Sequence, residues 1–227
     1  MALLLDNDIV HKLAQLDLLT EASQLLKEEY RELKVLSTFK FKFCPKKEAA
    51  RSKAEKKYGV LVVERIEAFL KSGITEIEES VEDECLLDAM SSDKDLNIGE
   101  MQLLQALLNE KEQLLFTSDK RFLQALSNTE VLQNRLIEIQ NSFVCFEQII
   151  HLLTKKISFE KVRNHYIEAK NNSYSVDEAL RLCFSSEPAK ITETQFLLNL
   201  ESYINDLQRE TNNLLISTPL FINHTTN

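Results

Sequence analysis

Apolar and polar residues alternate in blocks along this chain, and the length of each block predicts its secondary structure. Two short runs, Ala2–Leu5 and Leu114–Phe116, are wholly apolar. A strand without polar positions is typical of the middle of a parallel sheet, where both faces are buried. Polar and acidic residues follow each run, and a helical pattern comes after them. We therefore expect two neighbouring strand–helix units with acids at the carboxyl edge of the sheet, where open α/β sheets bind ligands.

Apolar residues at helical spacing cover most of the remaining chain. The expected helices are residues 9–16, 20–28, 46–58, 60–71, 81–90, 101–108, 121–126, 130–140, 147–156, 159–170, 176–184 and 192–215. Further strands are expected at 74–77 and 143–146. Another is expected at 34–43, because Phe39, Phe41 and Phe43 alternate with lysines at a period of two. The tail 219–227 carries no periodic signal, and we expect it to be frayed.

The scarcity of glycine and proline supports this pattern. Only three of each occur in 227 residues, which argues against an all-β fold with many tight turns. The sequence predicts an α/β fold with a central, mainly parallel sheet flanked by helices, followed by a mostly helical C-terminal region. We expect one domain at 1–147 and a helical extension at 148–227. The apolar stripe of the last helix suits packing on that domain or association into a dimer.

The net charge of −9 does not favour nucleic-acid binding, because an acidic protein repels a polyphosphate at long range. The charge is unevenly distributed, however. Residues 40–57 hold eight Lys or Arg and two Glu, whereas residues 76–88 hold seven acids and no base. The basic stretch is either a phosphate-facing surface or a solvated helix face, and the acidic stretch is typical of a solvated face.

The cysteines, histidines and N-terminus exclude several classes of protein. Four cysteines lie far apart among apolar neighbours, without zinc-ligand spacing, which favours buried reduced thiols. No nucleophile elbow or glycine-rich phosphate loop occurs. The N-terminus lacks the pattern of a signal peptide, and no stretch approaches the length of a membrane span. We expect a cytoplasmic protein that does not contact a membrane.

Three acids have the positions that a metal site needs. Asp6 and Asp119 follow the two apolar strands, and Glu100 begins a predicted helix. Mg²⁺ and Mn²⁺ prefer carboxylate oxygens. Two such ions about 4 Å apart stabilise the attacking and leaving oxygens in phosphodiester hydrolysis. We expect the missing Cβ of Gly99 to let the helix start approach the sheet edge.

Three segments resemble one family. LLLDNDIVHKL is similar to the first strand and helix of PIN domains, in which an Asp closes the strand and a polar or acidic residue follows two positions later. IGEMQLLQAL resembles the segment of bacterial PIN-like proteins in which Gly-Glu begins a helix. LLFTSDKRF resembles the strand that delivers a late acid followed by a basic residue. The resemblance to PIN-domain nucleases covers residues 1–147.

The resemblance implies Mg²⁺- or Mn²⁺-dependent cleavage of RNA, less often DNA, as in a toxin or phage-defence component with an antitoxin or other protein partner. It makes Asp6, Glu100 and Asp119 catalytic metal ligands, with Asp8 as a supporting ligand. The family has another acid near a helix start after the second strand. Glu48 matches it by position, and Glu55 is the alternative.

Each assignment has a structural alternative. Asp8 also suits the N-cap of the first helix, and Glu100 also suits a first-turn acid that complements the helix dipole. Lys120 and Arg121 either neutralise phosphate or screen the acids, and a tight pair with Asp119 would weaken metal binding. Two other functional readings are a catalytically inactive PIN-like module that binds nucleic acid or protein, and an unrelated helical scaffold.

Overall fold

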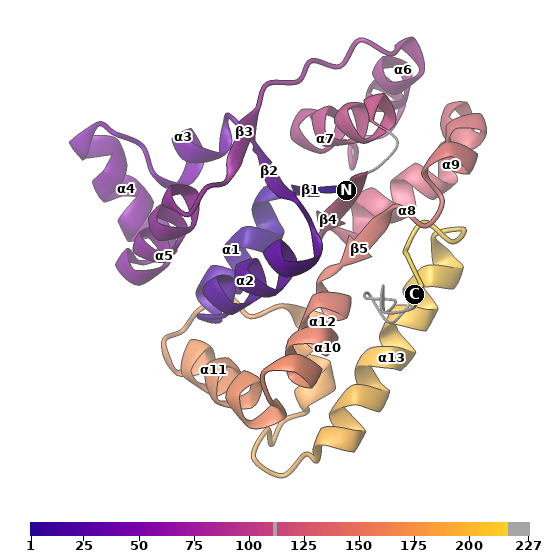
Figure 1. Cartoon of the computed structure of the whole chain (residues 1–227). Helices are drawn as coiled ribbons and strands as arrows, with labels where there is room; N and C mark the ends of the chain where they lie inside the picture. The colour runs from indigo at the N-terminus through magenta and orange to yellow at the C-terminus, as the bar shows by residue number, and fades with distance from the viewer. Residues whose placement is uncertain (111–112, 218–227) are drawn as a thin grey trace.

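The computed structural model describes residues 1–110 and 113–217, and its centre is a sheet of parallel strands (Figure 1). The strands are β1 (Ala2–Leu5), β2 (Glu32–Leu36), β3 (Thr75–Ile77), β4 (Gln113–Thr117) and β5 (Phe143–Cys145). Their order in the sheet is β3-β2-β1-β4-β5. The chain therefore builds the sheet outward from β1 on one side and then returns to build it outward on the other. The switch point lies between β1 and β4, which pair with Leu5 opposite Phe116.

Helices and one 3₁₀ turn account for most of the other residues. They are α1 (Asn7–Gln15), α2 (Leu19–Glu29), α3 (Phe39–Phe43), α4 (Glu48–Tyr58), α5 (Val60–Lys71), α6 (Glu84–Ser92), α7 (Ile98–Asn109), α8 (Lys120–Asn128), η1 (Glu130–Leu132), α9 (Gln133–Ile139), α10 (Phe146–Lys156), α11 (Phe159–Asn171), α12 (Glu178–Phe184) and α13 (Glu193–Glu210). Each predicted helix overlaps one of these elements. The predicted α/β fold with a parallel sheet and a helical C-terminal region is confirmed.

Alternate residues of the strands face two separate cores, as the pleat of a buried sheet requires. Leu3 and Leu5 of β1 join a core formed with α1, α2, α5 and the C-terminal helices α10–α12. Leu4 faces the opposite core, formed with α6–α9 and the end of α13. Figure 1 shows α1 and α2 on one side of the sheet and α6 and α7 on the other. The wholly apolar character of β1 follows from burial on both faces.

Residues beyond 147 contribute to both cores. Ile149, Phe159 and Phe196 pack with strand residues in the first core, and Ile204 and Leu207 pack in the second. Among the described residues, no helix is long and apolar enough to cross a membrane. The expected fraying of 219–227 lies outside the described residues.

Two element predictions are wrong. The strand expected at 34–43 ends at Leu36, and residues 39–43 form helix α3. A strand would put Phe39, Phe41 and Phe43 on one face, but Phe39 and Phe43 are buried while Phe41 is 67% exposed. Residues four apart share a face of a helix, so the same spacing of the two buried phenylalanines also suits a helix.

The last helix is shorter than predicted. It ends at Glu210 rather than at 215, because the backbone of Asn212 and Asn213 adopts positive φ angles of 51° and 63°. Asn tolerates this conformation better than most residues. The chain then turns so that Leu215 forms an isolated parallel bridge with Phe143 of β5.

Candidate functional site

The first and last of the three predicted acids lie on adjacent strands at the switch point. Asp6 directly follows β1, and Asp119 follows β4 with one residue, Ser118, between them. The backbone N–H of Asp6 donates to the carbonyl of Phe116 at 2.9 Å. The hydroxyl of Thr117 donates to Asp6 Oδ2 at 3.2 Å and accepts from the backbone N–H of Asp119 at 3.1 Å. Thr117 therefore links the two acids.

Asp6 is buried, and no Lys, Arg or His of residues 1–110 and 113–217 forms an ion pair with it. It is 6% exposed and occupies the N-cap position of α1, but its side chain does not cap the helix. Burial, and next the charge of Asp8, raise its pKa to about 6. The hydrogen bond from Thr117 and the charge of Lys42 act in the opposite direction but are weaker. Ionisation of Asp6 in the folded protein therefore costs free energy, and a bound cation would offset that cost.

The pKa of Glu100 is raised further from its ordinary value than that of Asp6. Glu100 lies in the first turn of α7 and is 5% exposed. Burial, and next the charges of Asp6 and Asp119, raise its pKa to about 9. This electrostatic effect indicates that the three carboxyl groups share one neighbourhood. At neutral pH Glu100 is protonated, so it has no charge with which to complement the dipole of α7.

Asn97 holds Glu100 in this position. Its side-chain oxygen caps α7 by accepting from the backbone N–H groups of Gly99 at 3.1 Å and Glu100 at 3.2 Å. Its amide Nδ2 donates to Glu100 Oε2 at 2.5 Å. The sequence reasoning missed Asn97, although the pattern Asn-x-x-Glu before an apolar helix is a capping signal. Thr117 was missed too, and nothing but its place after a strand pointed to it.

Gly99 does not have the expected role. A Cβ built on it would lie 3.5 Å from Asn97 Oδ1 and 4.0 Å from Leu36 Cδ1. Both are ordinary van der Waals distances, so the approach of the helix start to the sheet does not depend on the missing Cβ, and that expectation is wrong.

Asp119 is half-buried and caps α8. One oxygen, Oδ1, accepts from the backbone N–H groups of Arg121 at 2.9 Å and Phe122 at 3.1 Å. The cap orients the carboxylate at the end of β4. Its second oxygen has no hydrogen bond within the described part of the chain, so it is available to a ligand.

Lys120 does not neutralise Asp119. Its Nζ lies 2.7 Å from Oε1 of the fully buried Glu147 and 3.8 Å from Asp177 Oδ1. Asp177 also pairs with Lys12 at 2.7 Å. Burial acts to lower the pKa of Lys120, but Glu147 and Asp177 raise it overall. Lys120 and Lys12 thus pair with Glu147 and Asp177, and in the described residues neither forms an ion pair with Asp119.

Asp8 and Glu48 lie differently from the three central acids. Asp8 is exposed in the first turn of α1, where its Oδ1 lies 3.4 Å from Lys42 Nζ. The N-cap position belongs to Asp6, so the alternative in which Asp8 caps the helix is wrong. Glu48 is exposed at the first residue of α4, and the acids that act on Glu100 are Asp6, Asp119 and Asp8. Glu55 forms an ion pair with Arg51 at 2.8 Å.

The acids do not form a closed metal cage. In residues 1–110 and 113–217, no three or more His, Cys, Asp or Glu side chains gather tightly enough to hold a metal ion. The charges of Asp6 and Asp119 nevertheless act on Glu100, and Glu48 is not among the acids that act on it most.

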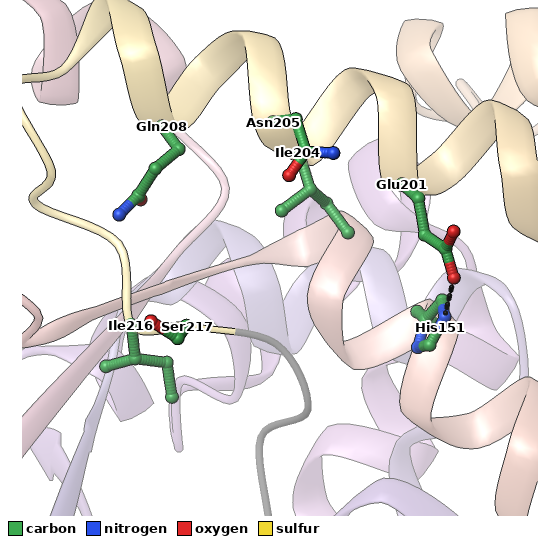
Figure 2. A pocket seen from close by; sticks show the side chains of 7 residues that line it. All are labelled: His151, Glu201, Ile204, Asn205, Gln208, Ile216 and Ser217. Atoms are coloured by element: carbon green, nitrogen blue, oxygen red, sulfur yellow. Dashed lines mark hydrogen bonds and ion pairs between the residues drawn. The ribbon is translucent and has the colours of Figure 1, made fainter.

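A cavity of about 460 Å³ lies elsewhere, between α10 and α13 (Figure 2). His151 Nε2 lies 3.1 Å from Glu201 Oε1 at one end of it, and Gln208, Ile216 and Ser217 line the other end. The lining contains no Ser or Cys nucleophile beside the histidine, since Ser217 lies at the opposite end in Figure 2. Glu201 is the one acid among the described residues of the lining, and it pairs with His151, so this cavity does not gather several carboxylates for an oxygen-liganded metal.

No protein-family model matches this chain, and comparisons with curated proteins and with solved structures find no match either. The functional interpretation therefore depends on the residues and their geometry.

Proposed function

We propose that this protein is a metal-dependent nuclease of the PIN-like kind that cleaves RNA, with Asp6, Glu100 and Asp119 as the acids of its active site. One observation carries the proposal. The charge of the buried Asp6, which follows β1 at the switch point of a parallel sheet, acts on the buried Glu100, and no Lys or Arg of residues 1–110 and 113–217 forms an ion pair with either acid. Groups with strongly perturbed pKa values at such a crevice are candidates for a functional site.

The donor chemistry fits Mg²⁺ or Mn²⁺. Mg²⁺ is commonly bound by one or two carboxylates, with waters and substrate phosphates completing its shell, rather than by an all-protein cage. Asp6, Glu100 and the second oxygen of Asp119 would hold it, and Asp8 at the exposed rim is the supporting candidate. In the described residues the side chains of Asp6, Glu100 and Asp119 do not lie close enough together to hold a metal ion, so the proposal requires them to move closer when the ion and substrate bind. When bound, the ion stabilises negative charge on phosphoryl oxygens.

The chain's own residues would prepare this chemistry. Thr117 orients Asp6, Asn97 orients Glu100, and the cap of α8 orients Asp119. Burial keeps bulk water from Asp6 and Glu100. Both acids must lose their protons for a metal to bind, so we expect metal affinity to rise with pH between about 6 and 9.

The decisive test is cleavage of RNA, with DNA as a parallel substrate, by purified Asp6→Asn and Asp119→Asn variants. Each should abolish Mg²⁺-dependent cleavage while the circular dichroism spectrum stays unchanged, and the exposed Glu84→Gln should cleave normally. Unchanged cleavage in either of the first two variants removes this mechanism.

The second candidate is a PIN-like module that binds nucleic acid or protein without cleaving it. The absence of a closed group of ligands in the described residues favours the loss of cleavage that it assumes. It predicts no cleavage and no shift of the melting temperature on addition of Mg²⁺ or Mn²⁺.

A further inference from the structure

An exposed basic surface covers α4 and the turn before it. We call it the α4 lysine surface, and its residues are Lys46, Lys47, Lys53, Lys56 and Lys57. All five are exposed, and none pairs with an acid in the described residues. The other basic residues of the same stretch are partnered: Arg51 pairs with Glu55 and Glu67, Lys40 pairs with Glu76, and Lys42 pairs with Asp8.

The spacing of these lysines is unfavourable in the isolated protein. Lys53 is three residues from Lys56 and four from Lys57, so all three share one face of α4. Like charges at these spacings destabilise a helix. A chain with a net charge of −9 holds this unneutralised cluster on one short helix, which indicates that the cluster meets a polyanion.

Phe41 adds an apolar platform to the same region. It is 67% exposed on α3, although its neighbours Phe39 and Phe43 are buried. The Nζ of Lys40 lies 5.5 Å from the centre of its ring. An exposed aromatic ring is a platform on which an unpaired nucleic-acid base can stack.

Aromatic contacts fix α3 and α4 to the strand–helix unit that carries Asp6. The ring of His11 on α1 lies 5.5 Å from that of Phe43 and 5.1 Å from that of Tyr58, at the end of α4. The pair of Lys42 with Asp8 places α3 beside the acidic rim of the site. Figure 1 shows α3 and α4 together on the β2–β3 side of the sheet. A polymer bound there would lie on elements that pack against α1, the helix that Asp6 precedes.

We propose that the α4 lysine surface and Phe41 bind single-stranded RNA, with phosphates on Lys53, Lys56 and Lys57 and a base stacked on Phe41. A single strand fits better than a duplex, because stacking on Phe41 needs an unpaired base. It fits better than an acidic protein, because phosphates recur along a strand as the lysines recur along α4. The proposal deepens the proposed function and rests on it for the choice of RNA.

The test measures binding without divalent ions, so that it does not depend on cleavage. A fluorescently labelled single strand of about 12 nucleotides, within the usual site size, is titrated with the full chain in EDTA at several salt concentrations, and anisotropy gives the Kd. Each phosphate contact on a single strand contributes about −0.7 to the slope of log K against log salt. The triple variant Lys53→Ala, Lys56→Ala and Lys57→Ala should therefore flatten this slope by about 2.

Two matched comparisons make the result specific. The control variant Lys155→Ala, Lys170→Ala and Lys190→Ala removes three exposed lysines from α10, α11 and the loop before α13, and it should bind like the wild type. Phe41→Ala should weaken binding by about 5- to 150-fold, and Phe41→Tyr should restore it, since stacking contributes about that much per base.

Several outcomes would overturn the proposal that the α4 lysine surface binds single-stranded RNA. Equal salt slopes for the two triple variants would do so, as would duplex RNA or polyglutamate binding as tightly as the single strand. Tight binding of the single strand in EDTA, together with no cleavage of it in Mg²⁺, supports the proposed RNA-binding surface and refutes the proposed nuclease activity. If the triple variant still cleaves RNA at an unchanged KM, the proposed RNA-binding surface is refuted and the proposed nuclease activity is not.

Discussion

Replacing Glu100 by glutamine should stabilise the metal-free protein, although it removes a residue of the proposed site. Glutamine keeps the shape of the side chain and an oxygen that can accept from Asn97 Nδ2, as Glu100 does at 2.5 Å. It removes the group whose ionisation the fold opposes. A gain in stability from a change in a buried polar side chain is unusual, because most substitutions destabilise.

The size of the gain follows from the pKa of Glu100. An ordinary glutamate has a pKa of 4.5, and in the folded protein burial, with the charges of Asp6 and Asp119, raises it to about 9. Between these pH values the folded state binds the proton that the unfolded state has lost. The free energy of unfolding therefore falls as pH rises, by about 1.4 kcal/mol per pH unit. The loss is roughly 3 kcal/mol by pH 7, and a glutamine does not incur it.

The assay is urea denaturation, followed by circular dichroism, of EDTA-treated protein at several values between pH 5 and 9. The stability advantage of Glu100→Gln over the wild type should be small near pH 5, reach roughly 3 kcal/mol at pH 7 and grow further toward pH 9. Glu84→Gln is the control, because Glu84 is an exposed first-turn glutamate of α6. A Glu100→Gln variant with the pH dependence of the wild type, or less stable than it at pH 8, would refute the reasoning.

Two further predictions concern parts of the fold that support the site. Lys120→Met should lower the free energy of unfolding by about 3–5 kcal/mol, because it leaves the fully buried Glu147 unpaired. Adding Glu147→Gln to this variant should recover most of the lost stability. Urea denaturation of the single and double variants checks this, and additive losses of stability would contradict it. Phe39→Ala should lower the free energy of unfolding by about 3–5 kcal/mol, and Phe41→Ala should change it by less than about 0.5 kcal/mol, because only Phe39 is buried. Equal losses in urea denaturation would instead support the strand that the sequence predicted.

Burial on both faces explains why the sheet could be predicted from the sequence. The runs at Ala2–Leu5 and Leu114–Phe116 have no polar position, and a central parallel strand suits such a pattern because both of its faces are buried. Because β1 and β4 are neighbours in the sheet, the acids that follow them had to lie near each other. The positions of Asp6 and Asp119 followed from these two facts.

Local patterns were weaker guides wherever tertiary contacts decide the outcome. Five residues with phenylalanine at every second position suit a strand, and a helix that buries only the outer two suits them equally. The apolar residues at 214 and 215 continue a helical pattern, but the chain uses them to reach β5. Neither outcome is encoded in the spacing alone.

The ion-pair network behind the site could not be predicted from the sequence. Lys12, Lys120, Glu147 and Asp177 come from four separate helix starts or helices, and only the tertiary fold brings them together. Asp177 lies in the C-terminal region, where sequence patterns gave helices but no relation to the site. The role expected of Gly99 was wrong for the same reason, since the space around a Cβ depends on neighbours that the local sequence does not specify.

The most direct test of the central claim is a crystal structure of the protein grown with Mn²⁺, at a pH near 8, with anomalous data to locate the ion. Carboxylate oxygens bind such ions at about 2.0–2.2 Å. The account predicts an anomalous peak in contact with Asp6, Glu100 and Asp119, and the same map would show whether Asp8 or Glu48 contributes. No peak at these carboxylates with millimolar Mn²⁺ present, or Asp6 and Asp119 found far apart, would contradict it.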